Sequence, residues 1–149
     1  MTVKPLVGET EYALSAVTDS LGFLTRVIHV QINDRLRASG LLSISPATLS
    51  LLRLIQANPG MRQNHAARIL LIQESNMANL VKDLIGRGLL ERRNMGARGG
   101  LWISEQGERE LAGCASVDAI DRSYASVLTD AEYRQLVRLL NRVYRAALA

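Results

Sequence analysis

The chain has 149 residues, a length that suits one domain built around one hydrophobic core. Hydrophobic residues make up 48% of it and aromatic residues only 4%, which predicts a helical core of Leu, Ala, Val and Ile. No run of 18 or more apolar residues occurs, and residues 1–12 lack the apolar stretch of a signal peptide. We therefore expect a cytoplasmic protein with no membrane partner.

The net charge of +4 is modest, and its position is more informative than its size. Residues 62–104 carry seven basic and three acidic side chains, whereas the rest of the chain carries eleven of each. The whole net charge is therefore concentrated in one segment. A basic segment on an electrically balanced scaffold is typical of nucleic-acid binding.

The composition argues against an enzyme or a metalloprotein. The two histidines, His29 and His65, belong to separate predicted helices without metal-ligand spacing, and the chain has no glycine-rich phosphate loop. The single cysteine, Cys114, excludes an intrachain disulfide; we expect it to be a small buried side chain in a helix, with redox sensing as the alternative. We expect no catalytic residue, no metal and no cofactor.

A long N-terminal helix is expected over residues 10–38, because apolar residues recur there at intervals of three and four: Leu14, Val17, Leu21, Leu24, Ile28 and Ile32. Such a helix of about 29 residues would span about 43 Å at ~1.5 Å per residue. One small domain cannot cover that length. Part of the helix should therefore pack on a second copy of the chain.

A shorter helix should follow, with Ser45 as its N-cap and Pro46 at its first position. It should end at Ala57, since Asn58-Pro59-Gly60 breaks a helix. This helix would support the basic segment that comes next.

The basic segment is predicted to form two helices joined by a tight turn. The second helix has an apolar face at Met77, Leu80, Val81 and Leu84. Its other face carries short polar side chains near the helix start, at Ser75, Asn76 and Asn79. Asparagine can pair with adenine through two hydrogen bonds and serine can reach several base edges, so this face suits a recognition helix. A solvated helix face is the alternative for this stretch alone.

A β-hairpin is predicted after the second helix. Residues 89–93 should form one strand and residues 101–103 should return antiparallel to it. Residues 94–100 contain three glycines and should form the turn between the strands. The hairpin would place Arg92, Arg93 and Arg98 beside the recognition helix, where phosphates or the minor groove can be contacted.

Two helices should follow the hairpin. Ser104 can cap the first, which we expect to reach about residue 127 with a bend near Gly113. Thr129 and Glu132 form a capping box for the last helix, with Leu128 and Tyr133 as its hydrophobic staple. That helix carries an apolar stripe and, opposite it, a basic row at Arg134, Arg138, Arg142 and Arg145. The row is interpreted as a solvated face that pairs with acids such as Asp118 and Asp121, with a second nucleic-acid surface as the alternative.

The chain resembles the multiple antibiotic resistance regulator (MarR) family of winged-helix transcription factors. The resemblance covers almost the whole chain and is carried by phrases in a fixed order: Asn58-Pro59-Gly60-Met61-Arg62-Gln63 before His65-Ala66-Ala67, then Asn79-Leu80-Val81-Lys82-Asp83-Leu84, Gly88-Leu89-Leu90-Glu91-Arg92 and Ile103-Ser104-Glu105-Gln106-Gly107. Two positions depart from the family pattern. The hairpin tip lacks the usual acid that precedes and braces an arginine, and Arg62 stands where Ser or Thr often caps the first helix.

This resemblance implies a mainly α fold with a small β wing, a winged helix-turn-helix flanked by dimerisation helices. The chain would be a single MarR-like domain, residues 1–149, with dimerisation helices at 10–38 and 105–148 and the DNA-binding lobe at 46–104. It implies a homodimeric repressor that binds a pseudo-palindromic operator in double-stranded DNA. The candidate contacts are Ser75, Asn76 and Asn79 for bases, and Arg62, Gln63, Lys82, Arg92, Arg93 and Arg98 for phosphates or the minor groove.

The resemblance also implies release from DNA by a small aromatic or acidic effector, bound between the dimerisation region and the DNA-binding lobe. The candidate effector residues are Phe23, Arg26, His29 and Arg53. Arg35-Leu36-Arg37 could equally accept a larger anion such as an acyl-CoA thioester. The alternative functions are a winged-helix module that binds protein, or a DNA-binding protein that responds to no ligand.

Overall fold

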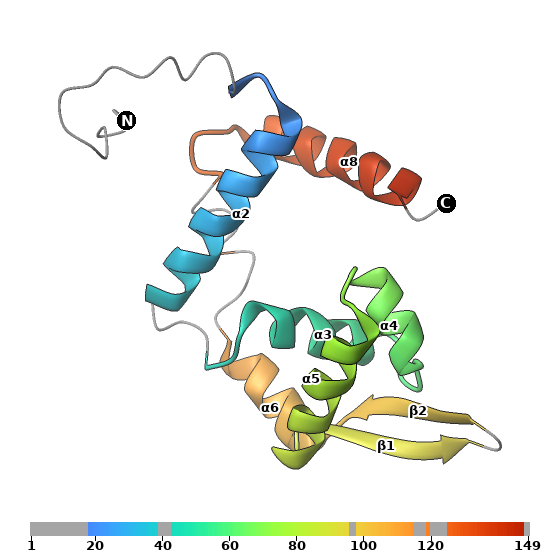
Figure 1. The fold of residues 1–149 in the computed structure, drawn as a ribbon. Helices are drawn as coiled ribbons and strands as arrows, with labels where there is room; N and C mark the ends of the chain where they lie inside the picture. The colour runs from blue at the N-terminus through green and yellow to red at the C-terminus, as the bar shows by residue number, and fades with distance from the viewer. Residues whose placement is uncertain (1–17, 39–42, 96–97, 115–118, 120–124, 148–149) are drawn as a thin grey trace. The chain divides into compact units, whose positions relative to one another are not determined.

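The computed structural model describes residues 18–38, 43–95, 98–114, 119 and 125–147 (Figure 1). The chain divides into two compact units, residues 1–35 and 36–149. Its described part is mainly helical with one small antiparallel sheet, as predicted. The elements in chain order are α2 (Leu21–Ala38), α3 (Pro46–Ala57), α4 (Gln63–Ile69), α5 (Glu74–Gly86), β1 (Leu90–Met95), β2 (Arg98–Ile103), α6 (Glu105–Gly113) and α8 (Asp130–Ala147).

The N-terminal helix differs from the prediction of one continuous helix over residues 10–38. Residues 10–17 lie outside the described part, and α2 begins only at Leu21. Ser20 precedes it without helical structure: its hydroxyl oxygen accepts a hydrogen bond from the Phe23 N–H at 3.4 Å and its carbonyl accepts one from the Leu24 N–H at 3.0 Å. Ser20 therefore starts a new helix, because its short polar side chain competes with helix continuation.

Helix α3 has the predicted bounds and the predicted cap. The Ser45 hydroxyl oxygen accepts a hydrogen bond from the Thr48 N–H at 3.2 Å, and Pro46 occupies the first position of the helix. One face of α3 is buried and lies at the centre of the core of the second unit. Leu51, Leu52 and Ile55 are fully buried there.

The core is completed by side chains from α4, α5 and the hairpin. Met77, Val81 and Leu84 form the buried face of α5, as the sequence predicted. They join one cluster with α3, the buried alanines of α4 and three hairpin leucines, Leu89, Leu90 and Leu101. Fully burying such a side chain contributes roughly 1.5–3 kcal/mol. This lobe therefore has its own hydrophobic core.

The hairpin is longer than predicted. Its strands pair in register from Leu90↔Ile103 to Met95↔Arg98, so the residues expected to form a seven-residue turn are mostly strand. Gly99 and Gly100 lie within β2. A Cβ at Gly100 would meet the carbonyl oxygen of Gly60, and the backbone of Gly60 and Met61 hydrogen-bonds to Leu101. Gly100 thus allows two backbones to approach closely instead of forming a turn.

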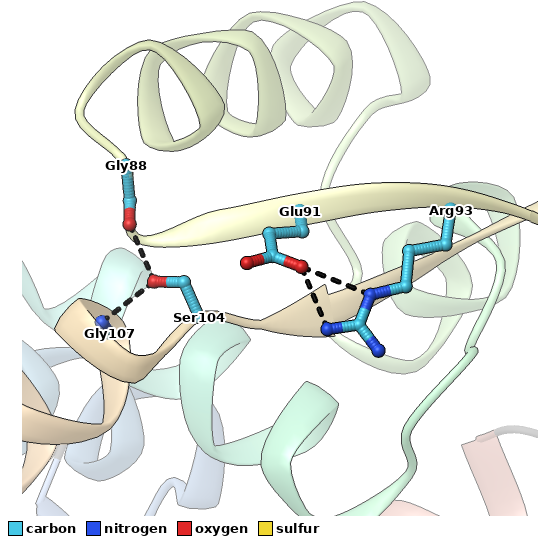
Figure 2. Close-up of polar contacts among 5 residues, drawn as sticks. All are labelled: Gly88, Glu91, Arg93, Ser104 and Gly107. Atoms are coloured by element: carbon cyan, nitrogen blue, oxygen red, sulfur yellow. Dashed lines mark hydrogen bonds and ion pairs between the residues drawn. The ribbon is translucent and has the colours of Figure 1, made fainter.

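Helix α6 starts where it was expected to and ends at Gly113, where a bend was predicted. Ser104 caps it, since its hydroxyl oxygen accepts the Gly107 N–H at 2.9 Å; the same hydroxyl donates to the Gly88 carbonyl (Figure 2). A Cβ at Gly107 would meet the Leu89 carbonyl oxygen, so this glycine lets α6 lie against the start of the hairpin. Cys114 is extended, with φ −67° and ψ 120°, and is buried in the core, so the helix is interrupted at the predicted bend. Residues 115–118 and 120–124 of the predicted continuation lie outside the described residues.

Helix α8 begins with the predicted capping box. The Thr129 N–H and hydroxyl donate to one oxygen of Glu132, at 2.8 and 2.7 Å, and the Glu132 N–H returns a bond to the hydroxyl at 3.3 Å. No residue of α8 is buried. Its apolar side chains are 40–54% exposed: Leu136, Val137, Leu139, Leu140, Val143 and Tyr144. Among the residues the structure describes, no helix has both the length and the apolar character needed to cross a bilayer.

Candidate nucleic-acid interface

The exposed face of α5 carries the side chains predicted to read bases. Ser75, Asn76 and Asn79 are exposed, and Lys82 lies one turn further along the same face. The opposite face is anchored in the core, so the orientation of this helix about its own axis is fixed. Amide and hydroxyl groups held on a rigid helix can pair with base edges in a major groove.

The turn between α4 and α5 sets the angle of these two helices. Leu71 adopts a positive φ of 53°, a conformation that a leucine rarely takes, and the Ile72 N–H bonds to the Ala67 carbonyl at 2.9 Å. The Leu71 side chain is 72% exposed. The turn is therefore made by backbone geometry with little packing of its central side chain.

The start of α4 lies beside the hairpin. Arg62 occupies the N-cap position and makes no capping hydrogen bond through its side chain. The next residue, Gln63, accepts a hydrogen bond from Arg92 of β1 at 2.8 Å. The structure therefore brings together the phosphate candidates of α4 and of the wing.

Arg92 and Arg93 leave β1 on opposite faces of the hairpin. Arg92 pairs with the buried Leu101, on the face that packs on the lobe. Arg93 shares the outer face with Glu91, since side chains two residues apart in a strand point the same way. Figure 2 shows the Glu91 and Arg93 side chains leaving the strand on the side away from the helix that leads into Gly88. The two arginines, grouped together from the sequence, therefore have different surroundings.

Arg93 is held by two neighbours on that outer face. Its Nε and Nη2 donate to one carboxylate oxygen of Glu91, at 3.0 and 2.8 Å. The centre of its guanidinium group lies 5.6 Å from the centroid of the Trp102 ring. The acid and the ring fix the arginine in place, whereas the partner of Arg92 is an uncharged amide.

Two other basic residues are placed less simply. Arg87, which follows α5 at its far end, pairs with Asp83 at 3.4 Å, so its charge is partly balanced. Arg98 opens β2 opposite Met95, and its side chain lies outside what the structure describes.

Comparison with known proteins identifies the family of the segment that holds the candidate interface. Residues 42–98, which contain α3, α4, α5, β1 and the start of β2, match the model of the MarR family. This segment of the chain belongs to the MarR family. No curated protein matches the chain significantly.

Solved structures of similar proteins agree with this assignment. A probable transcriptional regulator from Pseudomonas aeruginosa is 27% identical, with a TM-score of 0.73 over 85% of this chain and 98% of its own. A MarR-family regulator from Rhodococcus sp. RHA1 is 25% identical, with a TM-score of 0.72 over 86% and 96%. The repressor CouR, bound to a 23-mer DNA duplex, shares the fold at 22% identity, with a TM-score of 0.79 over 90% and 99%. Proteins of the MarR family are transcriptional regulators.

The candidate effector residues are distributed over both units. Phe23, Arg26 and His29 lie on the exposed surface of α2, where the His29 ring bonds to the Asn33 amide at 2.9 Å. Arg53 lies on α3 and lines a shallow pocket with Gln56, Glu108, Leu111 and Ala112. The joining of the four into one effector site stays a prediction.

Cys114 has a buried thiol with polar neighbours. Burial raises its pKa above the ordinary value, and the nearby Glu110 carboxylate adds to the rise, while Ser43 and Arg53 oppose it. Ser43 itself donates a hydrogen bond to Glu110 at 2.6 Å. The raised pKa favours the protonated thiol, which is the unreactive form.

Sequence reasoning missed the outer group of the wing. Glu91 and Trp102 were not candidates, yet both contact Arg93. The spacing of Glu91 and Arg93, two residues apart in a predicted strand, could have indicated that they share a face. The place of Trp102 required the strand register, which no local pattern supplied. Within the described residues, no group of three or more His, Cys, Asp or Glu side chains could hold a metal ion.

Proposed function

We propose that this MarR-family protein is a homodimeric, ligand-responsive transcriptional repressor that binds a pseudo-palindromic operator. One observation carries the proposal: the polar face of α5 is exposed while its opposite face is buried in the core. This helix lies in the segment that holds the whole net charge of the chain. The segment presents base-pairing side chains on a rigid helix and cationic side chains beside it. Together they provide the two kinds of contact that specific DNA binding requires.

The roles of individual residues follow from their positions. Ser75, Asn76 and Asn79 would contact base edges in the major groove. The remaining contacts, to phosphates or the minor groove, would be made by Arg62, Gln63, Lys82, Arg92 and Arg98, with Arg93 either contacting DNA itself or holding the wing in place. Each phosphate that is neutralised would steepen the dependence of log K on log salt by about 0.9.

A second copy of the chain would cover the exposed apolar face of α8 and part of α2. Two copies related by a twofold axis would place two α5 helices in successive major grooves, about 10 bp apart. This spacing requires an operator with two inverted half-sites. The proposal also places the protein in the cytoplasm, where such DNA lies.

The effector is proposed to be a small aromatic or acidic compound or its CoA thioester. The structure of CouR has also been solved with p-coumaroyl-CoA bound. Because this chain shares the fold of CouR, that ligand guides the choice of probes. A ligand that binds better to the state in which the two α5 helices do not fit the grooves would weaken DNA binding. Phe23 would pack on a ring, and Arg26, His29 or Arg53 would hold a carboxylate.

The test is fluorescence anisotropy with the DNA upstream of the protein's own gene, against scrambled competitor, over a salt series. We expect tight binding that survives the competitor and weakens steeply with salt. Asn79→Ala should reduce discrimination between the two DNAs, while Lys82→Gln should weaken binding to both and reduce the salt slope by about 0.9 per protomer. Arg109→Gln is the matched control, since Arg109 lies on α6, outside the candidate interface, and pairs with Glu105.

Equal and weak binding to both DNAs would contradict the operator proposal. It would favour the alternative of a winged-helix module that binds protein. Specific binding that no phenolic acid or CoA thioester weakens would instead favour a regulator that responds to none of these ligands. The two results separate the DNA-binding part of the proposal from its effector part.

A further inference from the structure

The outer face of the wing carries a connected group of three side chains, the Glu91–Arg93–Trp102 group. Glu91 holds two nitrogens of Arg93 at 3.0 and 2.8 Å, and the guanidinium group lies 5.6 Å from the centroid of the Trp102 ring. An arginine over an aromatic ring is attracted to it, and more so when a carboxylate fixes its orientation. The inference drawn from this group rests on the proposed function.

Trp102 connects the wing to the loop that leads into α4. A Cβ at Gly60 would lie 2.9 Å from the ring, and one at Gly100 would lie 2.8 Å from it. Both positions lack a side chain, so the ring rests directly on backbone from the loop and from β2. The place of the ring is therefore coupled to the position of the hairpin relative to the start of α4.

The two neighbouring arginines differ in charge balance. Arg93 forms an ion pair with Glu91, whereas Arg92 bonds to the uncharged Gln63. Arg92 points to the face that meets α4, and Arg93 points to the outer face. An arginine that already holds a carboxylate must give up that partner to bind a phosphate fully, while Arg92 has no such cost.

We propose that Glu91 and Arg93 are positioning residues that hold Trp102, and with it the wing, at the start of α4, and that Arg92 is the strand residue that contacts DNA phosphate. Arg93 then acts on DNA binding through the wing's position. Its removal misplaces the wing without deleting a phosphate contact.

The two roles predict opposite results for Glu91→Gln. If Arg93 bound a phosphate, removing the negative charge beside it would strengthen DNA binding. If Glu91 and Arg93 position the wing, the same substitution weakens binding, by about threefold for loss of one exposed ion pair and its ring contact. Arg93→Lys separates the roles again, since lysine can serve as a point charge for phosphate but cannot reproduce the two-nitrogen contact.

The experiment compares Arg92→Gln, Arg93→Gln, Arg93→Lys, Glu91→Gln and the double variant of Glu91→Gln with Arg93→Gln. Affinity for one duplex is measured over a salt series, with the active fraction fixed by stoichiometric titration. Trp102, the only tryptophan in the chain, reports its own surroundings by fluorescence. We expect Arg92→Gln to reduce the salt slope by about 0.9 per wing and leave the emission unchanged. The Arg93 and Glu91 variants should shift the emission and weaken binding about threefold at unchanged slope, and the double variant should be no weaker than the single ones.

Three results would overturn the inference. The first is a reduced salt slope for Arg93→Gln with a normal slope for Arg93→Lys, and the second is stronger DNA binding by Glu91→Gln. The third is unchanged affinity and unchanged emission in both Glu91→Gln and Arg93→Gln. Wild-type protein that bound no duplex would contradict the proposed function instead. The emission of the Glu91 and Arg93 variants would then still decide whether these residues hold the ring.

Discussion

The winged lobe and helix α8 obtain their stability in different ways. In the lobe, Leu51, Leu52 and Ile55 of α3 have no exposed surface, and side chains from α4, α5 and the hairpin share their core. The 18-residue α8 has no buried residue, although its apolar side chains form one stripe. The lobe is therefore stabilised by contacts within the chain, whereas the apolar stripe of α8 is exposed and is the surface that the proposed second copy would cover.

This difference has a physical consequence for α8. An isolated helix of this length is only marginally stable in water, and exposed apolar side chains give it little tertiary support. The capping box of Thr129 and Glu132 is local and acts without a partner. A second copy that covers the apolar stripe would supply the rest, which is why the proposed homodimer can be tested through stability.

The largest effect is expected from one substitution made in both regions. Leu52→Ala removes a fully buried side chain and should lower the free energy of unfolding by about 3 kcal/mol, whatever the protein concentration. Leu140 is 41% exposed, so Leu140→Ala should instead weaken self-association and make the melting temperature more dependent on concentration. Denaturant unfolding at two concentrations, with analytical ultracentrifugation, measures both. A Leu140→Ala variant that lost stability equally at every concentration would remove the contrast between the two regions.

The next effect is confined to the lobe and compares two glycines of one helix. Gly107→Ala places a methyl group against the Leu89 carbonyl and should cost about 2 kcal/mol, since a backbone cannot yield as a side chain does. At Gly113 a Cβ would meet no atom within 4 Å, so Gly113→Ala should be neutral or stabilise by up to about 1 kcal/mol. Thermal melts of both variants test this. Equal losses at the two positions would show that close packing on the hairpin is not what requires Gly107.

How much of this could be predicted from the sequence depended on whether the signal was local. Ser45 with Pro46, Ser104, and Thr129 with Glu132 marked helix starts correctly, because a cap depends on residues three apart. The break at Ser20 was missed, because the apolar period continues there across a serine that caps a new helix. Near Gly113 a bend was predicted and α6 ends, which the burial of Cys114 favours.

The candidate interface shows the same limit. Periodicity separated the buried face of α5 from its exposed face, because a helix repeats every 3.6 residues. It could not separate Arg92 from Arg93, since that required knowing which face of the hairpin packs on Leu90 and Leu101 and where Trp102 rests. The glycines of residues 94–100 suggested a wide turn. Gly100 instead lets the backbone of β2 lie close to the backbone of Gly60, which is distant in sequence.

A smaller loss is expected where one hydroxyl joins three elements of the lobe. Ser104→Ala removes the cap of α6 and the bond to the Gly88 carbonyl that follows α5 (Figure 2). We expect a loss of about 1–2 kcal/mol. Ser104→Thr should keep both bonds and most of the stability. Chemical denaturation measures the difference, and a Ser104→Ala variant as stable as wild type would show that neither bond contributes.

A gain is expected at the turn between α4 and α5. Leu71→Gly relieves a left-handed conformation that costs a leucine roughly 1–2 kcal/mol, and loses little packing because the side chain is 72% exposed. Glycine also makes the unfolded chain more flexible, which offsets part of the gain in stability, so the net gain should be about 0.5 kcal/mol. Gln56→Gly, at an exposed position of α3, is the control and should lose about 1 kcal/mol. Destabilisation by Leu71→Gly would mean that the leucine is covered, by a second copy or by another surface.

The smallest effect concerns the local support of α8 and its dependence on pH. Hydrogen bonds from the Thr129 backbone and hydroxyl lower the pKa of Glu132 below its ordinary value of 4.5. A carboxyl whose pKa is lower in the folded state stabilises that state above its unfolded pKa, and this stabilisation is lost as the pH falls through the folded pKa. Between pH 6 and pH 3 the wild type should therefore lose more melting temperature than Glu132→Gln, and Thr129→Ala should lie between them. Because every other acid titrates alike in the three proteins, the difference isolates the cap, and identical pH profiles would mean that α8 starts without it.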